Sequence, residues 1–389
     1  RLFRCLRAFC AMPLLKSLLG NSPWLAQGRS LFCVSQASVD RMAGLWGRAA
    51  VLALTLGWGV PVPMAVAAES PASAAPLPSA QAVSGDLDVT QWMAHMRGAA
   101  CRRSYVGTFV VISATGAMSS SRIAHACDGG LQVERVETLS GVPRTVFRRN
   151  GEVRTFFASS RTVRTDRSDT PALFPQPSVV AGTKLSQFYA VQRLGLERVA
   201  GRSADVLWLK PQDDLRLGYR IWADQETGLV MKLQTLSSNA KVMEQAAFSE
   251  IDWNASVKAE DLSRAMDAVD GFQRVSPEVR KTSAQEEGWV LRQPVEGFVP
   301  VQCYRRTLSV EAGARSVLQC LYSDGLASVS LFMESMDATR RGGVEVQEVS
   351  MGATQMLARR AGEDTWLTIV GEVPRKTLHL FSKHWERSR

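Results

Sequence analysis

The stretch 198–233, RVAGRSADVLWLKPQDDLRLGYRIWADQETGLVMKL, predicts three short strands separated by turns. Its apolar run 206–209 is stopped by Pro211, which has no N–H to donate to a neighbouring strand. Gly228 lies in a turn where a positive φ is favourable, and the apolar residues after it predict the returning strand of a hairpin. Strands that follow one another through short turns pair antiparallel. The stretch therefore indicates an antiparallel meander.

The same pattern extends toward the N-terminus. Residues 105–112 (YVGTFVVI) are rich in the β-branched and aromatic side chains that favour strands. The Asn-Gly pair at Asn150 is a strong hairpin signal, and residues 88–103 place apolar side chains on one stripe of a helix. We therefore expect a helix followed by a large curved antiparallel sheet over 87–256.

A second domain is expected after a polar, charged segment, 257–287, which indicates a linker with some helical propensity. Residues 288–385 again contain strand-like runs separated by turns, such as the one at Asp324, and end in a helical pattern. The chain's 389 residues are enough for two or three ordinary domains. The expected fold class is mainly β or α+β, with a large curved antiparallel half-barrel and a small α+β C-terminal domain.

Residues 42–68 have the layout of a secretory signal peptide. A short basic region precedes the apolar run 49–60, and the small residues 65–68 provide a cleavage site. The apolar run spans about a dozen residues, whereas a membrane-spanning helix needs about 20. We expect export to the periplasm, with 69–86 as a flexible N-terminus and 1–41 as a spurious upstream extension.

The net charge and the sequence motifs limit the classes of function that we expect for the chain. Residues 1–67 carry a net charge of +6 of the chain's +9, so the rest has only a small basic surplus and no basic stripe for nucleic acid. Common catalytic and cofactor motifs are absent from the sequence, and Asp213 and Asp214 are adjacent and so point to opposite faces of a strand. We expect a binding protein without enzymatic activity, cofactor or metal.

Four cysteines follow the expected signal peptide: Cys101, Cys127, Cys303 and Cys320. An even count in an oxidising compartment favours disulfides. Proximity in the sequence pairs the first with the second and the third with the fourth, while other connectivities and free thiols remain open.

A curved sheet can enclose an apolar cavity. Alternation along the strands gives its expected lining: Tyr105, Phe109, Val111, Val153, Phe156, Leu207, Leu209, Tyr219, Ile221, Leu229 and Met231. The same residues would serve equally well as a filled core. Exposed arginines on the strands are candidates for contact with an anionic head group: Arg122, Arg135 and Arg220.

Short segments spread over both expected domains share their wording with one known family: YVGTFV (105–110), SRIAH (121–125), DGG (128–130), ER (134–135), FP (174–175), RVAGR (198–202), GYRIW (218–222), TGL (227–229), EQ (244–245), YSDGLASVS (322–330) and GEVP (371–374). In this order they resemble the RseB/MucB family, periplasmic negative regulators of the envelope-stress sigma factor sigma-E. The likeness extends over about 88–381. The four cysteines and the long leader depart from the family pattern.

The resemblance implies a lipoprotein-carrier-like half-barrel with helices in its mouth and a small domain that helps to hold a partner. That partner would be the periplasmic segment of a single-pass inner-membrane anti-sigma factor, which the protein would shield from proteolysis. A lipid or lipopolysaccharide-like ligand would release it. Residues of the small domain that match the family are candidates for partner binding: Tyr322, Asp324 and Gly325.

A function of another class remains as the alternative, namely a periplasmic lipoprotein or lipid carrier that uses the same cavity. A minimal carrier would need only the large sheet, so the second domain distinguishes the two functions. The sequence leaves ligand identity and homo-oligomer formation open.

Overall fold

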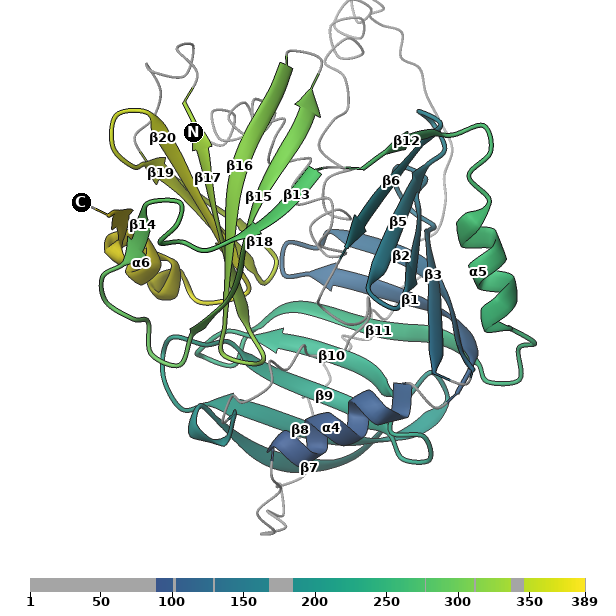
Figure 1. Ribbon diagram of the computed structural model, residues 1–389. Helices are drawn as coiled ribbons and strands as arrows, with labels where there is room; N and C mark the ends of the chain where they lie inside the picture. Colours follow the sequence, from purple (N-terminus) through teal and green to yellow (C-terminus); the bar gives the residue numbers. More distant parts are fainter. Residues whose placement is uncertain are drawn as a thin grey trace, which may run out of the picture.

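The computed structural model describes residues 89–100, 103–128, 130–167, 185–276, 278–310, 313–336 and 346–388. The described chain is mainly β, with a large and a smaller sheet that are mostly antiparallel, a two-stranded sheet of β14 and β21, and few helices (Figure 1). This confirms the expected fold class. The expected leader, the flexible N-terminus, Cys101 and segment 174–175 lie outside the described residues.

The large sheet has the strand order β12-β6-β5-β4-β3-β2-β1-β11-β10-β9-β8-β7, and its two ends do not pair, so it stays open. Consecutive strands pair antiparallel, and β1 joins the two halves by pairing with both β2 and β11. Besides β12, the large sheet contains β1 (Tyr105–Ser113), β2 (Met118–Asp128), β3 (Leu131–Thr138), β4 (Thr145–Arg149), β5 (Glu152–Phe157), β6 (Thr162–Arg167), β7 (Tyr189–Val199), β8 (Arg202–Pro211), β9 (Gly218–Asp224), β10 (Val230–Leu236) and β11 (Val242–Asp252).

Turn residues close these hairpins as their sequence predicts. Asn150 and Gly151 have φ values of 45° and 85° in the β4–β5 turn, the left-handed conformation that Asn-Gly adopts in two-residue hairpins. Gly228 has a φ of 75° in the β9–β10 turn. An added Cβ there would lie 2.9 Å from His95 Nε2, so Gly228 also permits the close approach of helix α4 (Val89–Ala100).

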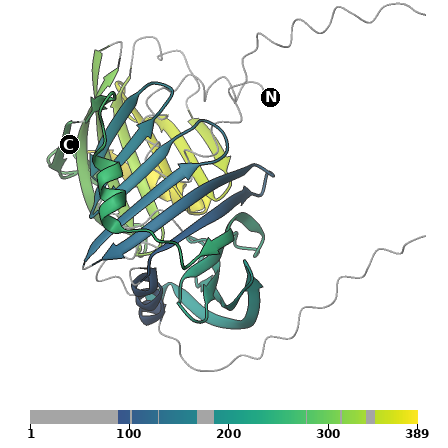
Figure 2. The same cartoon turned by 90° about the vertical axis from the view of Figure 1, so that its right-hand side faces the viewer.

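The helices α4 and α5 (Ala259–Asp267) cover opposite faces of the large sheet. Met93 of α4 packs with Leu207, whereas Leu262 of α5 packs with Ala126. Directly opposed residues on neighbouring strands share a face, and the strand register from β8 to β2 puts Leu207 and Ala126 on different faces. Figure 1 shows α4 across β7 and β8 and α5 beside β2 and β3. Figure 2, the view from the side, shows α4 and α5 at separate places on the large sheet.

The segment between the two domains is built into both sheets. After α5, strand β12 (Gln273–Val275) pairs in parallel with β6. Strand β13 (Glu278–Thr282) then pairs antiparallel with β15 of the smaller sheet. The expected linker therefore acts as a strap that adds an edge strand to each sheet, which restricts their relative motion.

The smaller sheet has the order β13-β15-β16-β17-β20-β19-β18 and packs against helix α6 (Arg375–His384). Leu318, Leu331 and Phe381 are fully buried in its core. The remaining elements are η3 (Leu185–Gln187), β14 (Trp289–Leu291), β15 (Val299–Val310), β16 (Gly313–Ser323), β17 (Ser328–Ser335), β18 (Val346–Met351), β19 (Thr354–Arg360), β20 (Thr365–Gly371) and β21 (Trp385–Arg387).

One of the two expected disulfides is present. Cys303 and Cys320 face each other across β15 and β16, with their Cα atoms 4.1 Å apart, and form a disulfide. Cys127, in contrast, carries a free thiol, so the predicted bond to Cys101 is absent from the structure. Strand β2 places Cys127 opposite Gln132 on β3, and Cys101 lies outside the described residues.

Candidate functional site

The junction of the two domains is organised around Arg216, in the loop between β8 and β9. Its side chain is completely buried. The guanidinium donates from Nε to Asp324 Oδ2 at 2.6 Å and from Nη2 to the carbonyl of Glu296 at 2.8 Å. It also pairs with Asp213 and lies 4.0 Å from the ring centroid of Phe188. Arg216 therefore connects the large sheet to the small domain through polar and cation–π contacts.

Asp324, in the β16–β17 turn, receives these contacts on the small-domain side. Its Oδ1 accepts the backbone N–H groups of Leu326 and Ala327 at 2.8 and 2.7 Å. Burial raises the pKa of Asp324 above its ordinary value, while the N–H of Leu326 and the guanidinium of Arg216 oppose that rise. Tyr189 donates to Asp324 Oδ2 at 3.4 Å, and burial raises the pKa of its phenol, which keeps the donor proton in place.

The loop at Gly297 leaves just enough room for this arrangement. Gly297 has a φ of +77°, and an added Cβ would lie 2.0 Å from Arg216 Nη2 and 2.6 Å from Phe188 Cζ. No side chain fits there without displacing the guanidinium. The glycine is therefore part of the junction.

Three further contacts surround the buried pair. Thr377 of α6 donates to the carbonyl of Leu215 at 2.6 Å. Lys376 pairs with Asp214 at the exposed rim. On the far side of the junction, Arg306 lies 3.7 Å from Asp166. The domains thus meet through several polar contacts from β6, the β8–β9 loop, β15 and α6.

All eleven residues of the expected cavity lining are buried, at 8% exposure or less. The strand register places most of them on the face that α4 covers: Tyr105, Phe109, Val111, Val153, Leu207, Leu209, Tyr219 and Ile221. Leu229 and Met231, in the β9–β10 turn and a bulge of β10, join the cluster that contains Tyr105. Phe156 lies on the other face, beside Met266 of α5. Leu207, Leu209, Tyr219 and Ile221 form the apolar layer beneath α4, whereas Tyr105, Phe109 and Val111 belong to a second cluster with Phe248.

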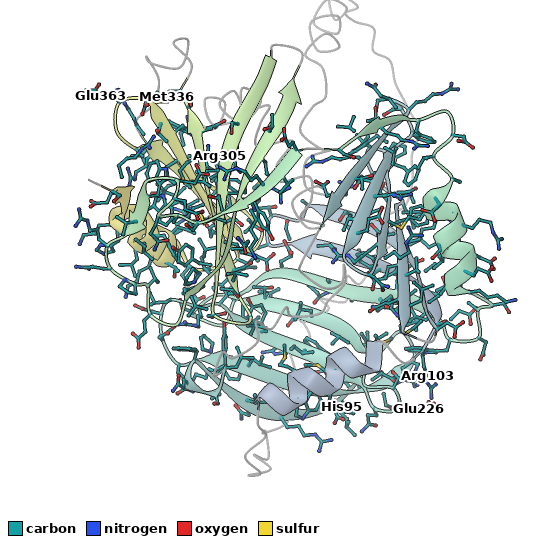
Figure 3. The ribbon with its side chains drawn as sticks, viewed as in Figure 1. His95, Arg103, Glu226, Arg305, Met336 and Glu363 are labelled. Carbon is teal, nitrogen blue, oxygen red and sulfur yellow. A yellow bond between two sulfur atoms is a disulfide. The ribbon has the colours of Figure 1, made fainter. Side chains whose placement is uncertain are left out.

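The helix α4 covers this layer, and an ion pair follows its C-terminal end. Met93 and Met96 pack onto Leu207 and Ile221. Figure 3 shows His95 on α4, with Arg103 and Glu226 near its C-terminal end, and the ion pair between these two spans 3.6 Å. Access to the apolar layer beneath α4 requires the helix to move.

The three candidate head-group arginines do not join the apolar layer. Register places Arg122 opposite Thr108, Arg135 opposite Ala124 and Arg220 opposite Gln234, all on the other face of the sheet. Arg122 is exposed, and Arg135 pairs with Glu137.

A different polar row lies on the apolar face itself. His125 is fully buried, its Nδ1 lies 3.1 Å from Glu134 Oε1, and its ring stacks on Tyr105. Arg148 on β4 lies directly opposite Glu134 on β3, and burial lowers the pKa of its guanidinium. The sequence alone does not reveal this row, because the three residues are brought together only by strand pairing.

The candidate partner-binding residues are part of the junction or its core. Tyr322 packs against Phe381 and Trp385 inside the small domain. Asp324 binds Arg216, and Gly325 has a φ of +98° in the same turn. The structure therefore gives these residues contacts within the chain. The sequence gives no signal for Arg216, because its partner Asp324 is more than a hundred residues away in the chain.

Two observations concern only the described residues. None of their His, Cys, Asp and Glu side chains form a group of three or more that could hold a metal ion. None of the helices in this part of the chain has the length and apolar character needed to cross a membrane.

Comparison with known proteins matches both halves of the chain. Residues 88–266 match the model of the MucB/RseB N-terminal domain, and residues 283–386 match that of the MucB/RseB C-terminal domain. The sigma factor AlgU regulatory protein MucB of Pseudomonas aeruginosa is 28% identical over 291 residues, which cover 74% of this chain and 87% of that protein. The sigma-E factor regulatory protein RseB of Escherichia coli K12 is 24% identical over 277 residues, or 70% of this chain and 83% of the relative.

Solved structures agree on the fold. The structure of the Pseudomonas aeruginosa MucA/MucB complex superposes with a TM-score of 0.60 at 25% identity, covering 78% of this chain and 100% of that chain. A crystal structure of MucB in complex with MucA(peri) gives the same TM-score and coverage at 23% identity.

Proposed function

The chain belongs to the MucB/RseB family, and from this premise we propose that it is a periplasmic regulator that binds the periplasmic segment of an inner-membrane anti-sigma factor. The observation that carries this proposal is the match of both domains, in order, to a family of regulatory binding proteins. Relatives of this chain have been solved as complexes with MucA, which supports a partner of the same kind here.

The regulatory step proposed for this chain is protection. Bound protein shields the anti-sigma factor from the protease that starts its degradation, so the sigma factor stays inactive. Export by a cleaved signal peptide at 42–68 brings the protein to the compartment of this partner. No catalytic step is required of the chain itself.

Release by a lipid-like signal is the second part of the proposal. A lipid can shift the equilibrium only if it binds the partner-free form better than the bound form. The apolar layer beneath α4 supports such a site, because Leu207 and Ile221 become accessible if α4 moves. The buried row of His125, Glu134 and Arg148 on the same face offers polar groups for a head group.

The junction residues are assigned an indirect role. Tyr322, Asp324 and Gly325 are buried or turn-forming, so we assign them the task of holding the two domains in the arrangement that the partner recognises. The buried Arg216–Asp324 pair supports this assignment, because its two members come from different domains.

Calorimetric titration with the soluble periplasmic segment of the anti-sigma factor, with and without lipopolysaccharide, tests the function. The chain from residue 69 onward is the protein to use. Micromolar or tighter binding that weakens when lipid is added is the expected result. Absence of binding under both conditions would contradict the regulator and favour the lipid or lipoprotein carrier.

A further inference from the structure

Charges are matched at three places where the two domains meet. Arg216 faces Asp324, Lys376 faces Asp214, and Arg306 faces Asp166. In each pair one residue belongs to the large sheet or its loops and the other to the small domain. A fourth meeting place has a carboxylate on both sides, Glu244 and Glu372, and it is the exception to this pattern.

Glu244 lies on β11 at the end of the large sheet that meets the small domain. The register aligns it with Ser113 on β1 and Thr235 on β10. The β18–β19 turn packs directly on it: an added Cβ on Gly352 would lie 2.3 Å from Glu244 Oε2. Figure 1 shows this end of the smaller sheet beside the ends of β10 and β11. Glu244 is half-buried, and the small domain therefore covers part of its carboxyl group.

Glu372 approaches from the small domain, immediately after β20. Burial raises the pKa of Glu372 to about 7. Burial, together with the nearby charge of Glu372, raises the pKa of Glu244 to about 8, although a hydrogen bond from the backbone N–H of Ala353 acts in the opposite direction. The strand register agrees with this: Gly371 lies opposite Gln355 on β19, so Glu372 is beside the β18–β19 turn, whose Ala353 N–H binds Glu244. The two acids therefore meet across the junction at this turn.

Among the residues that the structure describes, the groups around this pair supply no compensating cation. Neither Glu244 nor Glu372 forms an ion pair with a described residue. Arg375 of α6 is held by Glu348 and Ser350, and Arg216 is held by Asp213 and Asp324. Tyr219 also faces this region, and burial raises the pKa of its phenol well above the usual value, so it remains neutral.

We propose that Glu244 and Glu372 form a proton-dependent contact between the two domains. It holds the junction closed while at least one carboxyl is protonated, and it opens the junction when both are charged. This inference goes beyond the proposed function, because it concerns the free protein and needs no partner.

The direction of the pH effect follows from proton linkage. Both acids bind a proton more tightly in the closed junction than in solvent, where their ordinary pKa is 4.5. Lowering the pH therefore favours the closed form. The stabilisation is complete below pH 4.5 and is lost as the pH rises through about 7 and about 8.

The test compares the free protein at about pH 6 and about pH 9, a range that spans both transitions. Small-angle X-ray scattering measures the separation of the domains, and hydrogen exchange measures opening at the Arg216–Asp324 contact. We expect opening at the junction to increase at least tenfold at the higher pH, since each unit by which the closed form raises the pKa of a carboxyl contributes a factor of ten. Unchanged scattering and exchange across this range would overturn the proposal.

Substitutions separate the pair from other acids of the chain. Glu244→Gln and Glu372→Gln mimic the protonated carboxyl, so each variant should stay closed at both pH values. Glu260→Gln is the matched control, because Glu260 is an exposed acid on α5 whose side chain is 82% accessible; it should keep the pH response of the unmodified protein. If the Glu244 and Glu372 variants opened as the control does, the carboxyl pair would not be the cause.

Discussion

The apolar layer beneath α4 and the polar junction between the domains differ in what holds them together. The layer depends on burial of side chains such as Leu207 and Ile221, which tolerates many arrangements of similar volume. The junction depends on a buried Arg216–Asp324 pair whose geometry is fixed by hydrogen bonds on both sides. The layer therefore mainly stabilises the large sheet, whereas the junction mainly specifies how the domains are placed.

Breaking the junction should have the largest effect on stability. Arg216→Ala leaves Asp324 buried without its cation, and loss of one partner from a buried ion pair costs about 3–5 kcal/mol. Chemical denaturation followed by tryptophan fluorescence measures the change. Lys376→Ala, at an exposed ion pair of the same junction, is the control and should leave the midpoint nearly unchanged. An equal loss of stability in the two variants would contradict the claim that the buried ion pair contributes more to stability than the exposed one.

Opening a cavity in the apolar layer should cost somewhat less. Leu207 is fully buried against α4, and replacement of such a leucine by alanine costs about 3–4 kcal/mol. Hydrogen exchange should accelerate in α4 and β8 while the domain arrangement seen by scattering stays the same. A change in domain arrangement would contradict the claim that the apolar layer stabilises the large sheet without placing the domains.

Removing the disulfide tests the core of the small domain. The bond between Cys303 and Cys320 joins residues separated by 17 positions. Replacing both with serine should lower the stability of the small domain by about 3 kcal/mol through loss of the loop constraint. Thermal unfolding under oxidising and reducing conditions measures it, and the serine variant should match the reduced protein. A serine variant as stable as the oxidised protein would show that the bond contributes little.

The smallest effect is expected on the exposed face of the large sheet. Arg122 is exposed and lies opposite to the apolar layer, so Arg122→Ala should change neither stability nor the lipid response. Arg148→Ala, on the layer side, should weaken the effect of lipid on partner binding. Competition titrations with lipopolysaccharide compare the two variants. A weaker lipid effect for Arg122→Ala than for Arg148→Ala would place the lipid on the face of the sheet that carries Arg122.

The sequence could predict features that alternate along strands. Alternation found the apolar residues of β1 and β8, and the Asn150–Gly151 turn marked its hairpin. Sequence proximity found Cys303–Cys320, because both cysteines lie on one hairpin. The strand pattern also located the larger sheet as a whole.

Features that depend on pairing between distant residues could not be predicted. Arg216 meets Asp324 only after the two domains associate, and an arginine in a polar loop ordinarily indicates a solvated turn. Cys127 shows the same limit, because proximity in the sequence paired it with Cys101, whereas its thiol is free in the structure. The separation of the head-group arginines from the apolar layer also depends on the register.

The most direct test of the account measures partner affinity for Arg216→Lys beside Leu207→Ala. Lysine keeps the charge at 216 but cannot reproduce the forked contacts of the guanidinium with Asp324 and Glu296. Titration with the periplasmic anti-sigma segment should show weaker binding by about tenfold for Arg216→Lys, equivalent to about 1.4 kcal/mol. It should show nearly unchanged binding for Leu207→Ala. Unchanged affinity in Arg216→Lys would contradict the claim that the junction sets the arrangement the partner recognises.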